Sequence, residues 1–391
     1  MKVTFLVYNV FGMGGTVRTV VNTANYLVSK GYDIEIVSIR KTRKTPMFNL
    51  DSGISIQYLY DARRPKESTV LGSFKQLIKN YITKIPSFLI DRNEDLYHMF
   101  NIMTDIKLYR VLKTLKTDIL ITTIPSFNLL SAKYVSHNII KVGQEHKVFD
   151  QHADTLKKKI YKHYHQLDVL TCLTDEEKNG FEKILSLSKE KIIKIPNGTE
   201  IPFQTANLKN KTIIAAGRYV PDKGFDLLIQ AFALVKDEFP DWRVKIFGAG
   251  IEKEYLREEI FRTESYNNVF LMPKSNKLFD EMQTASIYAL SSRHESFGMV
   301  IIEAMSVGLP CVAFNSLGPK ELIKHEENGL LVDREDVVAF ADSLARLMKS
   351  YDLREKLGNN AKTYAYHFSL DEIGHLWEKT LIKLSNERRK N

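Results

Sequence analysis

Short apolar runs alternate with longer amphipathic segments along almost the whole chain. Apolar runs of about four to eight residues are typical of strands buried on both faces of a parallel sheet, and the segments between them keep helical spacing. The alternation predicts an α/β fold with parallel sheets. In the first half, the predicted strands are 3–8, 34–38, 119–122, 139–142 and 169–173.

The second half repeats the alternation. Its predicted strands are 212–216, 244–247, 269–272, 287–290 and 311–314, and its predicted helices are 225–235, 252–262, one from about residue 297, 337–349 and 353–367. A last helix over about 370–387 follows Ser369, which is a good N-cap. A chain of 391 residues with two such series predicts two domains. We expect a domain at 1–198, a polar linker at 199–210, a domain at 211–368 and a final helix at 369–391.

Two stretches of the first half are less regular. The first helix is predicted over 17–29, with Thr16 as a possible cap and Gly31 as its stop signal. Residues 61–110 show no clean alternation of strand and helix. Within them, Phe74 to Ile85 keep helical spacing with lysines off the apolar stripe, which fits either a helix on a membrane interface or a helix facing the core.

Composition places the chain among globular proteins: 44% of its residues are hydrophobic and 26% are charged. No apolar run approaches the roughly 20 residues of a membrane span, and the start has no outline of a signal peptide. Cys172 and Cys311 lie in apolar segments, as buried free thiols do. Together these features predict a cytoplasmic protein.

The net charge of +9 is unevenly placed. Residues 1–200 hold 30 basic and 20 acidic residues, a net +10, whereas residues 201–391 hold 26 and 27. A basic half indicates an anionic partner, which could be an acidic polymer, a membrane surface or nucleic acid. A generally basic proteome would give the same asymmetry. No aromatic–basic motif of a nucleic-acid reader is present, so we expect no nucleic-acid partner.

Glu295 and Glu303 form the most informative pair of residues. On one continuous helix they would lie about 80° and roughly 12 Å apart, too far to share a proton. Residue 295 instead follows a predicted strand, and a helix begins between the two acids. The unpaired amides of its first turn offer an anion site. Hydroxyl-binding acids on either side of an anion site match the outline of a sugar nucleotide.

Two loops follow the first strands of the two halves. Gly14 and Gly15 let backbone approach a ligand closely, although a simple tight turn would use them equally well. Arg218 and Lys223 bring two cations to the corresponding loop of the second half, where they can neutralise a diphosphate or remain solvated. Such loops at the carboxyl ends of strands face the ligand crevice of an open α/β sheet.

His146 ends a strand of the first half in the run Gln-Glu-His. A histidine there can contact a sugar hydroxyl or move a proton, and it can equally be an ordinary hydrogen-bonded side chain. Gly318-Pro319 and Asn328-Gly329 read as turns, and the former can supply backbone near a ligand.

In chain order, the motifs are Gly-Gly-x-x-Arg, Glu-His, Pro-Asn-Gly, Gly-Arg-x(4)-Lys-Gly, Glu-x(7)-Glu and Gly-Pro-x-Glu-Leu-Ile. Together they resemble the retaining glycosyltransferases of family four, which include sucrose synthase-like and lipid mannosyltransferase-like enzymes. The resemblance implies the GT-B fold: two Rossmann-like domains facing a cleft, with a C-terminal helix that crosses back to the N-terminal domain.

The resemblance also implies roles for individual residues. Arg218 and Lys223 would hold the donor diphosphate, Glu295 the donor sugar and Glu303 the ribose, while His146 would face the transferred sugar. Arg18 would serve the acceptor side or the phosphate cradle. The remaining implied donor or substrate contacts are Gly14, Gly15, Asn197, Ser296, Phe297, Gly298, Met299, Gly318 and Pro319. No metal and no cofactor are implied, because the nucleotide sugar is a substrate.

The opening residues 7–19 resemble those of bacterial cell-envelope enzymes, including teichoic-acid α-glucosyltransferases. This resemblance favours a UDP-linked glucose or N-acetylglucosamine donor and an anionic glycopolymer or lipid-linked glycan as acceptor, with contact to the inner face of the membrane. Two rivals stay open. A nucleotide-dependent oxidoreductase would need the missing G-x-G-x-x-G loop. A catalytically silent glycan- or nucleotide-sugar-binding partner of an active enzyme would be expected to lack residues such as Lys223.

Overall fold

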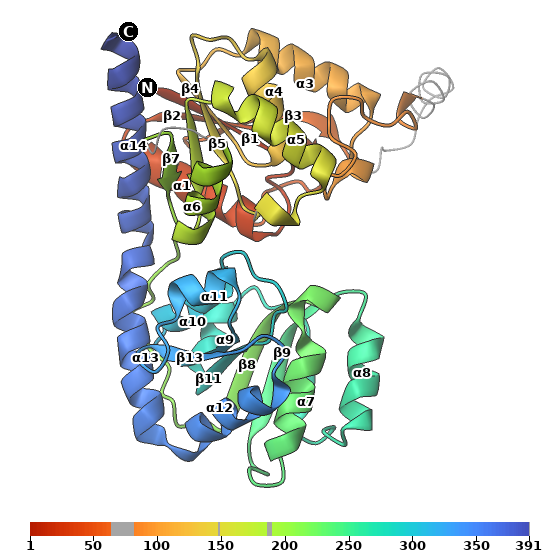
Figure 1. Ribbon diagram of the computed structural model, residues 1–391, viewed down its shortest axis with the longest axis vertical. Coiled ribbons are helices and arrows are strands. Elements are labelled where there is room, and N and C mark those ends of the chain that lie inside the picture. Colours follow the sequence, from red (N-terminus) through yellow and green to blue (C-terminus); the bar gives the residue numbers. More distant parts are fainter. Residues whose placement is uncertain (64–81, 148, 186–189, 391) are drawn as a thin grey trace. The chain divides into compact units, whose positions relative to one another are not determined.

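The computed structural model describes residues 1–63, 82–147, 149–185 and 190–390. The chain forms two compact units, coloured along the sequence in Figure 1. Unit 1 comprises Met1–Pro196 and the C-terminal segment from Ile373, and unit 2 comprises Asn197–Glu372.

Unit 1 is built on a seven-stranded parallel sheet in the order β3-β2-β1-β4-β5-β6-β7. The strands are β1 (Lys2–Val7), β2 (Asp33–Lys41), β3 (Ser55–Asp61), β4 (Ile119–Thr122), β5 (Ile140–Gln144), β6 (Val169–Cys172) and β7 (Ile192–Lys194). The helices are α1 (Gly15–Ser29), α3 (Ile102–Thr114), α4 (Pro125–Tyr134), α5 (Asp154–His163) and α6 (Asp175–Leu185). Residues of β1 enter hydrophobic clusters on both faces of the sheet, which explains its continuous apolar run.

The structure corrects the prediction for unit 1 in three places. Strands β3 and β7 were not predicted, because β3 is a half-exposed edge strand and β7 has only three residues. Helix α1 begins at Gly15 with Gly14 as its N-cap, so Thr16 lies in the first turn and does not cap the helix. Gly31 does follow the helix end with a φ of +83°. The helix predicted from Phe74 lies, in its larger part, outside the described residues.

The last helix, α14 (Leu370–Lys390), leaves unit 2 and continues on unit 1. Ser369 accepts the hydrogen bond of the Glu372 amide at 3.2 Å, which is the cap expected from the sequence. Trp377 and Leu381 are buried in the same cluster as the first strand. Gly374 lies so close to the ring of Tyr26 that a Cβ there would come within 2.2 Å of it. The predicted return of the C-terminal helix is therefore confirmed.

Unit 2 holds a six-stranded parallel sheet in the order β10-β9-β8-β11-β12-β13. The strands are β8 (Thr212–Arg218), β9 (Arg243–Ala249), β10 (Val269–Met272), β11 (Ile287–Leu290), β12 (Cys311–Phe314) and β13 (Gly329–Val332). The helices are α7 (Phe225–Val235), α8 (Lys253–Arg262), α9 (Leu278–Gln283), α10 (Met299–Ser306), α11 (Leu317–Leu322), α12 (Val337–Lys349) and α13 (Tyr351–Ala365).

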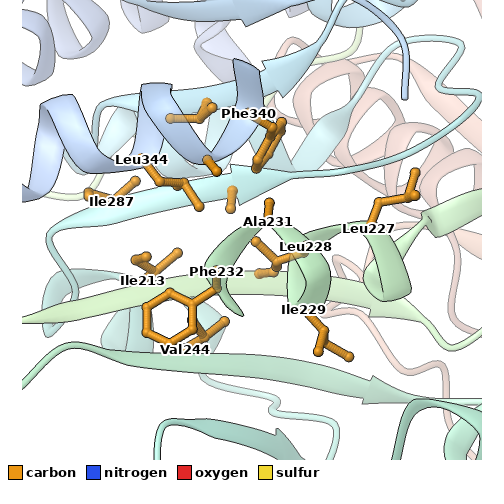
Figure 2. Packing of buried hydrophobic residues seen from close by; sticks show 14 of the residues in the cluster. Ile213, Leu227, Leu228, Ile229, Ala231, Phe232, Val244, Ile287, Phe340 and Leu344 are labelled. Atoms are coloured by element: carbon orange, nitrogen blue, oxygen red, sulfur yellow. The ribbon is translucent and has the colours of Figure 1, made fainter. Parts of the chain in front are cut away.

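The core of unit 2 lies between its sheet and the helices α7 and α12. Figure 2 shows Phe232 of α7 and Phe340 and Leu344 of α12 among buried side chains of the strands. The predicted bounds of α7, β10, β11, β12 and α12 agree with the structure. The short elements α9, α11 and β13 were not predicted. Residues 199–210 pack on this unit: the Ala206 amide donates to the Val307 carbonyl at 2.8 Å, and Leu208 is buried.

The candidate active site

Three loops of unit 2 follow the carboxyl ends of neighbouring strands β8, β11 and β12. They contain residues 219–224, 291–298 and 315–316. Because the strands are parallel and adjacent, their carboxyl ends lie along one edge of the sheet, where open α/β sheets bind ligands. Most of the residues predicted for the donor diphosphate and sugar come from these loops or from the elements next to them, namely Arg218, Lys223, Glu295 and residues 296–299. Gly14, Gly15 and His146 lie in unit 1.

Lys223 and Glu295 are brought together from positions 72 residues apart. Lys223 Nζ donates to Glu295 Oε2 at 2.5 Å, and both side chains are mostly buried, with exposed fractions of 20% and 15%. Lys223 ends a 3-10 turn that begins at Pro221. The following Gly224 has a φ of +57°, and a Cβ there would lie 2.1 Å from the Ser291 carbonyl oxygen. Glycine is therefore required where the two loops touch.

Arg293 connects the same two loops, and its role was not predicted from the sequence. Its guanidinium donates two hydrogen bonds to Asp226, at 2.9 and 2.6 Å, and a third to the Pro221 carbonyl at 2.8 Å. Its backbone amide also donates to the Asp222 carbonyl at 2.9 Å. The hydrogen bond with Asp226 raises the pKa of Arg293. This fork fixes the loop of Glu295 against the loop of Lys223.

The start of α10 lies against the β12–α11 loop. Gly298 is the N-cap of α10 with a left-handed backbone, and Phe297 before it is buried. The Gly318 amide donates to the Glu295 carbonyl at 2.9 Å, and a Cβ on Gly318 would lie 2.2 Å from the Phe297 carbonyl oxygen. The structure thus places Gly318-Pro319 directly beside the predicted residues Ser296 to Met299. These contacts hold the first-turn amides of α10 at the sheet edge.

Glu303 lies on α10 and is 2% exposed. Tyr288 is buried on β11, and both acids of the Glu-x(7)-Glu motif affect its pKa. Burial raises the pKa of Tyr288 well above its usual range, and the charges of Cys311, Glu303 and Glu295 raise it further. Glu303 thus lies on the helix and Glu295 on the loop before it, and their roles toward the ribose and the sugar stay predictions.

Arg218 ends strand β8 and is exposed. Within the described ranges, no ion pair involves its guanidinium, in contrast to Lys223 and Arg293. Two serines that sequence reasoning did not single out lie on the neighbouring loops. Ser292 and Ser316 are buried, and their hydroxyls find no hydrogen-bond partner among the residues that the structure describes. Each is the second residue after the end of a buried strand, which was the only available signal for either.

In unit 1, the β1–α1 loop carries Gly14 and Gly15. The backbone of Gly14 is extended, and a Cβ there would meet nothing within 4 Å. Internal packing therefore does not require glycine at this position. Arg18, on the first turns of α1, lies with its guanidinium carbon 5.3 Å from the centre of the Phe48 ring. Asn197, predicted as a substrate contact, is buried at the start of unit 2.

His146 follows strand β5 and lies at the carboxyl edge of the unit 1 sheet. Its Nε2 is buried and makes no hydrogen bond within the described ranges. Burial lowers the pKa of His146 to about 4. The imidazole is therefore neutral at pH 7, so that one ring nitrogen accepts and the other donates a hydrogen bond.

Behind His146 lies a buried polar network centred on Glu145. Its Oε1 accepts hydrogen bonds from the Tyr164 hydroxyl and, at 3.0 Å, from Asn128 Nδ2. Its Oε2 lies 3.5 Å from His152 Nε2. The charge of Glu145 also affects two further acids, Glu94 and Glu177. Burial and the charge of Glu145 raise the pKa of Glu94 and raise that of Glu177 to about 7.

Other features of the described chain carry less chemistry. A cavity of about 330 Å³ lies between α14 and the start of β1, lined by Tyr32, Ile382 and Arg389 among others, at the amino edge of the sheet. Within the described ranges, no three His, Cys, Asp or Glu side chains cluster as metal ligands would. No described helix has both the length and the apolar character for crossing a membrane. Cys172 and Cys311 are buried free thiols, as predicted.

Two parallel α/β units, donor-type loops at the sheet edge of the second and a last helix that returns to the first define the GT-B class of protein. The family comparisons agree with this fold. The profile of the family "Glycosyltransferase Family 4" matches residues 13–201, and that of "Glycosyl transferases group 1" matches residues 198–364. The chain belongs to these GT-B glycosyltransferases. The predicted family and fold class are therefore confirmed.

Two similar proteins have names that refer to polymers. An exopolysaccharide phosphotransferase of Streptomyces coelicolor is 33% identical over 99% of this chain, which spans only 41% of that protein. A poly(glycerol-phosphate) alpha-glucosyltransferase of Bacillus subtilis is 28% identical over 60% of this chain and 36% of its own length. Among solved structures, a TarM mutant of S. aureus in complex with fondaparinux, alpha-GlcNAc-glycerol and UDP superposes with a TM-score of 0.75. It covers 98% of this chain and 99% of its own at 16% identity, which supports the fold alone.

Proposed function

We propose that this protein is a retaining hexosyltransferase that transfers a sugar, glucose or N-acetylglucosamine, from a UDP-linked donor to a cell-envelope glycopolymer or lipid-linked acceptor without a metal ion. The observation that carries the proposal is the contact of Lys223 with Glu295 beside the start of α10. A phosphate-binding cation, a sugar-binding acid and unpaired helix amides thereby occupy one short stretch of the sheet edge.

The chemistry follows from where charge develops. The bond between the anomeric carbon and the diphosphate breaks, and its electron pair leaves with the nucleoside diphosphate. Arg218, Lys223 and the first-turn amides of α10 would stabilise that negative charge. Glu295 would then bind hydroxyls of the sugar, while Glu303 would accept hydrogen bonds from the ribose. In this scheme the cations do what a metal ion does in other transferases, which is our reason for proposing metal independence.

We assign retention to attack from the same face as the departing diphosphate. The acceptor oxygen forms the new bond to the anomeric carbon, and its proton passes to a departing phosphate oxygen. Glu295 is held by Lys223 and is positioned for binding. Neutral His146 would offer a hydrogen bond to the transferred sugar. A glycosyl adduct trapped on Glu295 would contradict this scheme, because that carboxylate would then be a nucleophile.

The test measures donor binding and donor turnover separately. We expect UDP-glucose or UDP-N-acetylglucosamine to raise the melting temperature more than GDP- or ADP-sugars do, because a donor stabilises the fold that binds it. Glu303→Ala should abolish this stabilisation and lower kcat/KM for donor hydrolysis about 100-fold, since buried hydrogen bonds to a charged group are lost. Added EDTA should change neither quantity.

The matched control is Glu254→Ala, which removes an exposed acid of α8 that accepts a hydrogen bond from Arg257. It should leave both measurements as in the wild type. A second candidate function is a catalytically silent nucleotide-sugar-binding protein that partners an active transferase. That reading predicts the same thermal stabilisation without any donor turnover, so the two measurements together decide between the candidates.

A further inference from the structure

Four cations lie within five residues at the carboxyl end of β2: Arg40, Lys41, Arg43 and Lys44. The edge strand β3 runs beside them, with Arg40 opposite Tyr60 and Lys41 opposite Asp61. We call Arg40, Lys41, Arg43, Lys44, Tyr58 and Tyr60 the β2–β3 basic edge. From residue 40 to residue 44, an extended chain spans at most roughly 14 Å. The four cations therefore belong to one short segment, with Arg40 and Lys41 on the strand and Arg43 and Lys44 just after its end.

Aromatic rings, and not carboxylates, hold the first two of these cations. Lys41 Nζ lies 4.6 Å from the ring centre of Tyr58 and 5.3 Å from that of Phe11. The guanidinium carbon of Arg40 lies 5.8 Å from the ring centre of Tyr60. A ring face attracts a cation, yet it carries no net charge that could cancel the cation's charge. The two cations are thus positioned while their positive charge persists.

The cations of the basic edge have no acidic partner among the residues that the structure describes, in contrast to several other surface cations. Over the described ranges, none of the four cations of the basic edge takes part in an ion pair, and Arg43 and Lys44 are exposed. The carboxylate of Asp61, opposite Lys41, is bound by Arg63. The hydrogen bond with Arg63, and to a lesser extent the charges of Arg63 and Lys41, lower the pKa of Asp61 to about 2. By contrast, exposed Lys211 is paired with Asp241 at 2.8 Å. The basic edge therefore retains a concentrated positive charge that attracts anions.

The basic edge lies next to the β1–α1 loop, which precedes Arg18, a residue predicted to serve the acceptor side or the phosphate cradle. Asn9 Nδ2 donates to Thr42 Oγ1 at 3.0 Å, which ties the segment after β2 to the loop after β1. The Arg40 amide donates to the Tyr8 carbonyl at 3.0 Å. Gly14 and Gly15 follow on that same β1–α1 loop. A polymer that lies along the basic edge would reach this loop.

We propose that the β2–β3 basic edge binds the acceptor, and that the acceptor is a polymer with repeating phosphodiesters joined by hydroxyl-rich units. This inference rests on the proposed function. Several neighbouring cations without acidic partners can bind successive phosphates of a chain, and the hydroxyls of Tyr58 and Tyr60 can hydrogen-bond the hydroxyls of a polyol. The rings lie under cations, which leaves them less suited to stacking on nucleic-acid bases. Of the two tyrosines of the edge, Tyr58 is exposed and Tyr60 is partly buried, so the edge offers little apolar surface for insertion into a membrane.

The experiment measures binding of fluorescently end-labelled poly(glycerol phosphate) at several salt concentrations. The double variant Arg43→Glu/Lys44→Glu should bind about tenfold more weakly at low salt. Its affinity should also depend less steeply on salt, because fewer counterions are released. Both side chains are exposed, so the melting temperature should stay as in the wild type. A neutral dextran of equal length should bind the wild type no better than the variant.

The matched control is Lys113→Glu/Lys116→Glu, which changes the net charge equally. Lys113 also lies over aromatic rings, those of Tyr109 and Tyr134. It lies near the end of α3, shortly before the amino end of β4, whereas the basic edge lies at the carboxyl end of β2. This control should bind the polymer within twofold of the wild type. Unchanged binding in the Arg43/Lys44 variant, or an equal loss in the control, would overturn the inference.

Two further results would also overturn it. One is tighter binding of a single-stranded oligonucleotide than of poly(glycerol phosphate), and the other is tighter binding to vesicles of anionic phospholipid. Stabilisation of the wild type by UDP-sugars tests the proposed function by itself. If the donor stabilises the protein but the polymer does not bind, the acceptor inference fails while the transferase proposal stands.

Discussion

The loops of the candidate donor site in unit 2 and the β2–β3 basic edge in unit 1 handle charge in opposite ways. At the donor site, acids and cations meet in pairs: Glu295 holds Lys223, and Asp226 holds Arg293 through two hydrogen bonds. At the basic edge, the cations are segregated from acids, although pairs such as Lys159 with Asp91 occur elsewhere in unit 1. Arg40 and Lys41 lie on aromatic rings, while the acids Glu145 and Glu177 are buried in the interior of the unit.

The difference matches what each edge is proposed to bind. Paired charges fix side-chain geometry, which suits a compact donor whose phosphates and hydroxyls must meet particular atoms. Uncancelled charges attract at longer range with little geometric demand, which suits a flexible polymer. Paired charges therefore favour precise placement of the donor, and unpaired cations favour capture of the polymer from solution.

The strongest test of the paired edge is Lys223→Ala. We expect kcat/KM for the donor to fall about 100-fold to 1,000-fold, because one cation that would stabilise the leaving diphosphate is lost and Glu295 loses its partner. Steady-state hydrolysis of the donor measures this effect. Lys211→Ala, which breaks an exposed pair with Asp241, should retain wild-type kinetics. A similar loss in both variants would mean that Lys223 acts through general stability.

A smaller effect is expected for Arg293→Lys. Lysine keeps the charge but cannot form the fork to Asp226 or reach the Pro221 carbonyl at the same time. We expect a loss of about 1–2 kcal/mol, seen as a melting temperature lowered by about 3–6 °C, together with about tenfold weaker donor turnover. Arg346→Lys, in an exposed pair with Glu326, should change neither quantity. Unaltered turnover in Arg293→Lys would contradict the proposal that Arg293 positions the two loops.

The mildest test concerns the buried acids of unit 1. The pKa of Glu177 is raised from about 4.5 to about 7, so the folded protein binds a proton that the unfolded chain has released between these values. Its contribution to stability is therefore fully present below pH 4.5 and is lost as the pH rises toward 7. Between pH 5 and pH 8, the wild type should lose about 1–2 kcal/mol of unfolding free energy through Glu177. Glu177→Gln should not show this loss.

Thermal unfolding at several pH values measures this difference. Glu176→Gln, on the same helix α6 but exposed, serves as the control and should keep the wild-type pH dependence. An identical pH dependence in Glu177→Gln and the wild type would show that Glu177 does not contribute this change. The burial of Glu177 would then not lower the free energy of unfolding at neutral pH.

The sequence by itself determined the elements whose signal is local. Helices 225–235 and 337–349 and strands 269–272, 287–290 and 311–314 followed from apolar runs and spacing, because an element buried on a defined face must carry that pattern. The sequence also placed Lys223, Glu295 and Gly318 at one sheet edge, since the carboxyl ends of adjacent parallel strands coincide.

The tertiary structure alone decided which side chains meet. Nothing in the local pattern near Arg293 points to Asp226, 67 residues earlier, or places Lys41 over the ring of Tyr58. Strand β3 escaped prediction because an edge strand is half exposed and lacks a continuous apolar run. Such contacts depend on strand register and on the approach of loops distant in sequence. Residue type states what a side chain can bind, and only the folded chain selects the partner.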